Sequence, residues 1–178
     1  MACISKLANA IAYDCDTGAT GLISAMIINK ADIASFTIDT VGSTVSALTL
    51  NPGATAFKID TVKRSLVVSS ALKINDGAPN AYSHSATVVY TGDAVTALRK
   101  TMDAFTNGSF VILAKGLKGS AVVYGLYYGL SATSSDRSSH DNGGWITTVL
   151  STPENVIGED SITAPDNVYD ALYAAAVG

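Results

Sequence analysis

The chain has 178 residues, 48% of them hydrophobic and only 15% charged, and its net charge is −4. This length suits one domain, and the composition excludes an intrinsically disordered protein. The acidic balance argues against a conventional nucleic-acid-binding protein, which needs a basic surface to hold phosphates. So few charges indicate a weakly polar surface, which is covered by neighbouring subunits more often than it faces water.

The N-terminus is a poor secretory signal, because it has one lysine and a weak apolar stretch interrupted by Asn9. No stretch reaches the roughly 18 apolar residues of a membrane span, so we expect no membrane partner and no export. Cys3 and Cys15 are too few for a disulfide scaffold and lack the paired spacing of a zinc site. We interpret them as reduced small hydrophobic residues, with a bond between them as the minor alternative.

Strand signals recur about every ten residues through the first half of the chain, which favours an antiparallel β-sandwich or barrel over a parallel α/β sheet. Turns are predicted at 51–53, where Pro52 fixes one dihedral angle and Gly53 accepts a positive φ, and at 75–79. His84 lies in the last of these strands, on the same face as Tyr82 and Val88. The predicted strands are 22–28, 33–38, 44–50, 54–59, 62–74 and 82–90.

One packed helix is predicted over about 93–106, because apolar residues recur there at the spacing of a single helical face. Asp93 is the expected N-cap, and Asn107 and Gly108 are expected to supply the left-handed conformation that closes a helix. The apolar face consists of Val95, Leu98, Met102 and Phe105.

The second half of the chain begins with a predicted hairpin, 109–114 and 120–128, that turns on Gly116 and Gly119. A polar loop over 131–142 then leads to a strand that opens at Trp145, which anchors either the core or an interface. Residues 167–177 form either a short helix or an extended arm packed on a neighbour. The expected organisation is a single domain, 1–178, with extended terminal arms at about 1–20 and 151–178.

Asp14 and Asp16 are the most tempting catalytic candidates. Asp16-Thr17-Gly18 is the triplet of aspartic proteases, but it occurs once, so two chains would be needed for the paired carboxylates. Asp14 and Asp16 also have the Asp-x-Asp spacing of haloacid-dehalogenase-type phosphatases, whose chemistry belongs to an α/β fold. A plain turn is the preferred interpretation, and a hydrolase that uses Asp14 and Asp16 is kept as the enzymatic alternative.

Other residues give weaker catalytic signals. Ser139, His140 and Asp141 are adjacent in sequence, which is not the geometry of a catalytic triad. His84 is expected to be a hydrogen-bonded wall residue, and two histidines without a cysteine pair make a transition-metal site improbable. The glycines near the predicted hairpin are not followed by the Lys-Ser/Thr of a phosphate loop. We therefore predict no catalytic residue, no cofactor and no metal.

The order of elements from 93 to 155 carries a family resemblance. A short helix ends at Phe105-Thr106-Asn107-Gly108, the strand 110–113 follows, then the run 123–130, and a polar loop leads to the strand 143–150. In this pattern the chain resembles the tail-tube proteins of bacteriophages, which are related to the inner tube of type VI secretion systems. The resemblance implies a β-sandwich or barrel flanked by a helix, assembled into hexameric rings whose inner sheets line a lumen.

The resulting expectation is a non-enzymatic structural protein of a virion, assembled in the host cytoplasm into a sixfold ring. Its partners would be further copies of itself and other tail or connector proteins, with DNA as a transient, non-specific passenger. The alternatives are a capsid decoration protein, a head-tail connector, the hydrolase above and a monomeric carbohydrate-binding module.

Overall fold

The computed structural model describes residues 21–39, 43–61, 65–90, 95–117, 119–137 and 146–178, without the side chains of 95–99 and 137. These residues are mainly β, with two α-helices, α1 (Val95–Asn107) and α2 (Asp166–Ala175), and a 3-10 turn, η1 (Lys30–Asp32). The strands are β1 (Leu22–Asn29), β2 (Ile33–Ile38), β3 (Val45–Leu50), β4 (Phe57–Ile59), β5 (Leu66–Lys73), β6 (Ala81–Tyr90), β7 (Ser109–Gly116), β8 (Ala121–Tyr124), β9 (Leu130–Arg137), β10 (Ile146–Ser151) and β11 (Ile162–Ala164).

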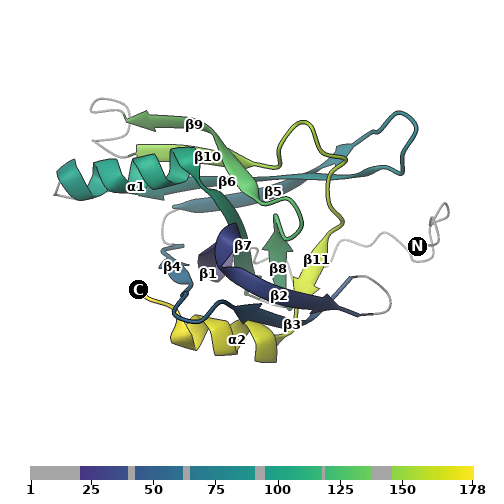
Figure 1. Cartoon of the computed structure of the whole chain (residues 1–178), viewed down its shortest axis with the longest axis horizontal. Coiled ribbons are helices and arrows are strands. Elements are labelled where there is room, and N and C mark those ends of the chain that lie inside the picture. Colours follow the sequence, from purple (N-terminus) through teal and green to yellow (C-terminus); the bar gives the residue numbers. More distant parts are fainter. Residues whose placement is uncertain (1–20, 40–42, 62–64, 91–94, 118, 138–145) are drawn as a thin grey trace.

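The elements form three tiers, which Figure 1 shows from top to bottom. The upper sheet has the order β5-β6-β10-β9, and the middle sheet has the order β4-β1-β7-β8-β11. The lower tier contains the β2–β3 hairpin and α2. Strand β7 joins the two sheets, because its first residues pair with β9 and its later residues pair with β8. All pairings between these strands are antiparallel, so the predicted antiparallel β-sandwich is confirmed.

Strands β1 and β7 lie between two hydrophobic cores. Ile27 and Ile112 contact the core under the upper sheet, whereas Met26 and Leu113 contact the core that the lower tier covers. Both faces of these central strands are buried, which explains why their sequences are continuous apolar runs without the alternation of a half-exposed strand.

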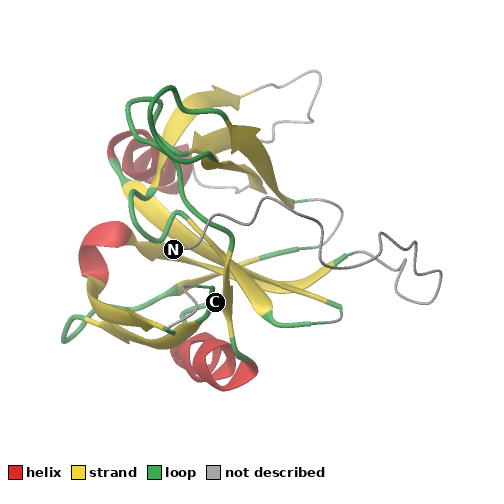
Figure 2. Cartoon of the chain, turned by 90° about the vertical axis from the view of Figure 1, so that its right-hand side faces the viewer, coloured by secondary structure: helices red, strands yellow, loops and turns green. Residues whose placement is uncertain are grey.

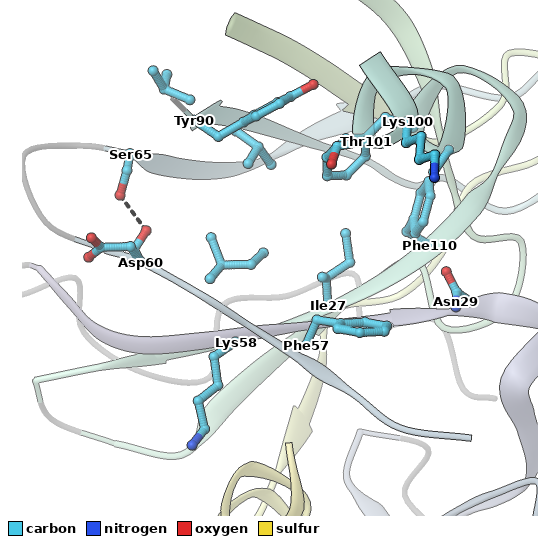
Figure 3. A pocket seen from close by; sticks show the side chains of 15 residues that line it. Ile27, Asn29, Phe57, Lys58, Asp60, Ser65, Tyr90, Lys100, Thr101 and Phe110 are labelled. Atoms are coloured by element: carbon cyan, nitrogen blue, oxygen red, sulfur yellow. Dashed lines mark hydrogen bonds between the residues drawn. The ribbon is translucent and has the colours of Figure 1, made fainter. Parts of the chain in front are cut away.

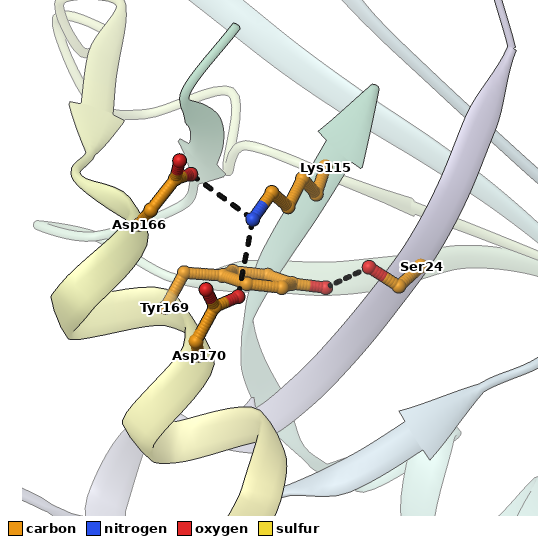
Figure 4. A network of polar contacts seen from close by, with 5 residues as sticks. All are labelled: Ser24, Lys115, Asp166, Tyr169 and Asp170. Atoms are coloured by element: carbon orange, nitrogen blue, oxygen red, sulfur yellow. Dashed lines mark hydrogen bonds and ion pairs between the residues drawn. The ribbon is translucent and has the colours of Figure 1, made fainter. Parts of the chain in front are cut away.

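The C-terminal segment packs on its own chain, so the predicted extended arm over 151–178 is corrected here. Strand β11 pairs with β8, and α2 buries Tyr169 against the lower core. Figure 4 shows how the helix is held: the Tyr169 hydroxyl lies 2.8 Å from Ser24 Oγ, and Lys115 Nζ lies 3.0 Å from Asp166 and 3.1 Å from Asp170. The short-helix alternative for 167–177 is the correct one. Its hydrophobic face is stabilised by packing, which a short isolated helix lacks.

Residues 131–137 are part of strand β9, so the predicted polar loop over 131–142 is wrong for this part; 138–145 lie outside the described residues. Leu130 and Ala132 contact the upper core, while Thr133 and Ser134 are exposed. The strand was missed because its solvent-facing positions carry serine and threonine, which sequence patterns also associate with loops.

Strand β8 ends at Tyr124, four residues before the predicted end, because Gly125 turns the chain with a φ of +78°. A Cβ on Gly125 would lie 2.8 Å from Leu130 Cγ and 3.0 Å from the Phe110 carbonyl oxygen. Gly119, in the β7–β8 turn, also has a positive φ but faces open space. The predicted hairpin turn there is confirmed.

These two glycines provide a matched pair of substitutions. Gly119→Ala is expected to cost about 1–2 kcal/mol for the left-handed conformation alone. Gly125→Ala should cost a further ~1–3 kcal/mol because the new methyl group overlaps packed atoms. Urea unfolding followed by circular dichroism measures both values. Equal losses for the two variants would show that the close approach at Gly125 is unimportant.

Helix α1 ends at Asn107 as predicted within one residue, but Gly108 closes it for a different reason. Gly108 does not have a positive φ. Instead, a Cβ there would lie 2.3 Å from Phe110 Cζ and 2.7 Å from the Ala104 carbonyl oxygen. The glycine therefore permits close packing, and the predicted left-handed closure is wrong. The predicted N-cap, Asp93, lies outside the described residues.

Candidate assembly surface

The outer face of the upper sheet is an open surface of small, mostly uncharged side chains. Cross-strand partners share a face, so the strand registers identify its members. Two of its hydroxyls, Ser69 Oγ and Ser85 Oγ, lie 2.8 Å apart. Lys73 and Asp136 are the charged side chains on the paired positions of this face, which are Val67, Ser69, Ala71, Lys73, Ala81, Ser83, Ser85, Thr87, Val89, Ser131, Ser134, Asp136, Thr147, Val149 and Ser151.

Both ends of this sheet are edge strands. Among the described residues, β5 pairs only with β6, and β9 beyond Ser131 pairs only with β10. Helix α1 packs near β9, but a helix uses its backbone groups internally and cannot complete a sheet edge. Edge β5 also exposes large apolar side chains: Val67 is 48% exposed and Leu72 is 60% exposed. Exposed apolar edges of this kind are the surfaces on which further strands add.

The directions of the two edge strands are opposite. The order β5-β6-β10-β9 contains three antiparallel pairings, so β5 and β9 run antiparallel to one another. If β9 of one copy lies beside β5 of the next, the new pairing is again antiparallel. Such a head-to-tail contact repeats around a closed ring without leaving an edge.

The β5–β6 hairpin is braced where it extends beyond the core. Lys73 Nζ donates to the Glu154 carbonyl oxygen at 2.9 Å and to that of Val156, and Asn75 Nδ2 donates to the Ile157 carbonyl oxygen at 2.8 Å. The backbones of Tyr82 and Glu159 exchange two hydrogen bonds. Figure 2 shows the molecule from the side toward which the hairpin extends. The bracing fixes the direction of the exposed strand.

A buried acidic residue lies next to this hairpin. Glu159 Oε1 accepts hydrogen bonds from the backbone amides of Tyr127 and Tyr128 at 3.1 and 2.7 Å. Its Oε2 is buried without a hydrogen-bond partner among the described residues. The carboxylate raises the pKa of both Lys30 and His84, but burial has the larger effect and lowers the pKa of each below its ordinary value.

His84 is the buried wall residue that the sequence predicts. Its Nδ1 lies 2.8 Å from Ser70 Oγ, its backbone amide donates to Thr152 Oγ1 at 2.9 Å, and its ring contacts Tyr124 edge to face. The backbone contacts of His84 with Thr152 join the hairpin to the segment after β10, and its ring joins the hairpin to Tyr124 of β8. His84 therefore has a structural role at the base of the hairpin.

Acid is expected to destabilise the protein through His84. Its pKa in the folded chain lies below the ordinary 6.5, chiefly because of burial, so the unfolded chain binds the proton more readily. The contribution of neutral, buried His84 to the free energy of unfolding is complete above pH 6.5, and it decreases as the pH falls from there toward the lowered pKa. Urea unfolding at pH 7.5, 6.5 and 5.5 measures this decrease. His84→Asn, which does not titrate, should flatten the pH dependence; an unchanged slope would assign it to other groups.

The remaining sequence candidates lie mostly outside the described residues. These are Cys3, Asp14, Cys15 and Asp16, together with Ser139, His140, Asp141 and Trp145. The part of the chain that the structure describes contains no group of three His, Cys, Asp or Glu side chains able to hold a metal ion. Neither α1 nor α2 is long and apolar enough to cross a membrane.

Sequence reasoning missed Glu159 and the two edge strands. Glu159 stands beside Asp160 in a segment with few other charges, which was an available signal, but its partners are backbone amides some 30 positions away along the chain. Edge positions depend on strand order, which alternating patterns do not contain.

A scan of protein-family models finds no match to the chain, nor do searches of curated proteins and of solved structures.

Proposed function

We propose that this protein is a structural component of a virion that assembles into a ring, sixfold as the tail-tube resemblance implies, and lines a channel for DNA. The observation that carries the proposal is the pair of opposite edges of the upper sheet, which no strand of the described residues completes. Joining β9 of one copy to β5 of the next satisfies both edges and produces one continuous antiparallel sheet around an axis.

The outer face of the upper sheet supports this role. In the closed ring, the face rich in serine and threonine forms one wall of the sheet, and the opposite face is covered by the chain's own core. A DNA passenger must slide past without being held, and holding requires a cluster of Lys and Arg on phosphates. The paired positions of this face carry one charge of each sign, Lys73 and Asp136, and Lys73 Nζ donates to the carbonyl oxygens of Glu154 and Val156. These positions therefore hold no cluster of Lys and Arg, and the face is suited to non-specific passage.

Electron microscopy of the purified protein, with light scattering over a range of concentrations, tests the proposal. Rings or stacked tubes are the expected result, and a chain that remains monomeric at millimolar concentration contradicts it. Other ring symmetries, or a position at the head-tail junction or on the capsid, would favour the connector or decoration alternative. Asp14→Asn with Asp16→Asn should leave assembly intact; a protease or phosphatase activity lost in this variant would support the hydrolase alternative.

A further inference from the structure

A cavity of about 800 Å³ opens beneath helix α1, between the upper and middle sheets. Its walls come from β1, β4, β6 and the start of β7, and α1 covers it from one side (Figure 3). In the order β4-β1-β7-β9-β10-β6-β5, no pairing joins β4 to β5 among the described residues, so the sandwich has an open seam there. Ligand sites often lie at such openings, and their volumes are typically ~300–1,000 Å³.

The walls of the cavity are apolar and aromatic. Phe105 lies 5.6 Å from Tyr90 and 5.2 Å from Phe110 between ring centroids, so three rings form a connected cluster. Phe57, Ile27 and other aliphatic side chains such as Ile59 and Val88 also line the cavity. An apolar ligand group that enters this preformed cavity is removed from water, and this burial of apolar surface favours binding.

Different polar side chains lie at the two ends of the cavity. Figure 3 shows Lys100 at one end with its Nζ beside Phe110, and Asp60 at the other end with Ser65. Ser65 Oγ donates to the Asp60 carbonyl oxygen. No described acidic side chain forms an ion pair with Lys100. Lys58 also borders the cavity, but its Nζ lies 4.9 Å from the centre of the Tyr173 ring and points away.

We propose that this cavity binds an amphiphile that has one apolar chain and one anionic head group. The chain occupies the aromatic middle of the cavity, and the head group lies at the Lys100 end. Asn29 is at the same end, where its Nδ2 already donates to Asp32 at 2.7 Å, so Lys100 supplies the charge that recognises the anion. This ligand site goes beyond the proposed structural role and does not depend on it.

Calorimetric titration with dodecanoate, below its micelle-forming concentration, tests the site, with dodecanol as the uncharged probe. Dodecanoate is expected to bind with a one-to-one stoichiometry and more tightly than dodecanol. Lys100→Met removes the charge and keeps most of the side-chain length. It should weaken dodecanoate binding about tenfold, the value of one charge-assisted contact, and leave dodecanol binding unchanged. Lys58→Met is the matched control and should change neither.

Ala104→Phe is the second variant, because it fills the cavity from the exposed face of α1 without removing any packed group. It should abolish binding of both probes while circular dichroism and thermal unfolding remain near those of the native protein. The proposal is overturned if dodecanoate fails to bind the native chain, if Ala104→Phe binds it normally, or if Lys58→Met and Lys100→Met have equal effects.

Discussion

The double substitution Val67→Lys and Leu72→Lys is expected to keep the protein monomeric at concentrations at which the native chain forms rings. Val67 and Leu72 are exposed on opposite faces of edge strand β5. Natural proteins protect sheet edges with lysine, because strand addition would bury the ammonium groups beside an apolar contact. A cost of roughly 1–2 kcal/mol at each junction raises the assembly concentration by about tenfold or more.

The matched control places threonine at the same two positions. Threonine keeps β-propensity and removes the same apolar area without adding charge. Light scattering should show rings for the threonine variant at concentrations only moderately above those of the native chain, and monomers for the lysine variant. Because both sites are exposed, the two variants should unfold at similar temperatures. Assembly of the lysine variant at the native concentration would exclude β5 as the subunit interface.

The second large effect is expected from Tyr169→Ala, which should destabilise the folded chain by about 3–5 kcal/mol, as truncation of a buried aromatic residue does. Tyr169 is 1% exposed, stacks on Tyr173 and has Lys115 Nζ 5.4 Å from its ring centre. Its loss leaves a cavity between α2 and the middle sheet. Urea unfolding monitored by circular dichroism measures the change in free energy of unfolding.

Tyr169→Phe is the control for this prediction. It keeps the ring and removes only the hydroxyl that hydrogen-bonds Ser24, so the expected loss is about 1 kcal/mol. A small loss for Tyr169→Ala would mean that α2 contributes little to the core and would revive the extended-arm interpretation. Assembly of Tyr169→Phe should resemble that of the native chain, because α2 lies in the tier away from the upper sheet.

Individual strands were predictable where turn residues and alternation agree. Gly53 and Gly77 have the positive φ values that the predicted turns require, and His84, Ala86 and Val88 share the buried face. The predicted ends of strands were wrong where tertiary packing determines the end of the strand. Gly125 ends β8 because Leu130 and Phe110 lie close to its Cα. Strand β9 was not predicted because its solvent-exposed face carries serine and threonine, which are also typical of loops.

The candidate surfaces were less predictable than the strands. A charge-poor composition indicates that the surface is suited to contact with other chains, but not which strands are edges. Lys100 is distant in sequence from Phe57 and Asp60, and the three residues line one cavity only because the fold places α1 near β4. The ring, the virion role and the DNA passage remain predictions that assembly experiments can decide.

The sequence by itself determined the antiparallel β class, the positions of the main turns and the single predicted amphipathic helix, because these depend on local periodicity and on the backbone preferences of glycine and proline. Only the tertiary structure decided the strand order, the two-sided burial of β1 and β7, and the docking of α2. These features arise from contacts between residues far apart in the chain, and their free energy is absent from any local segment.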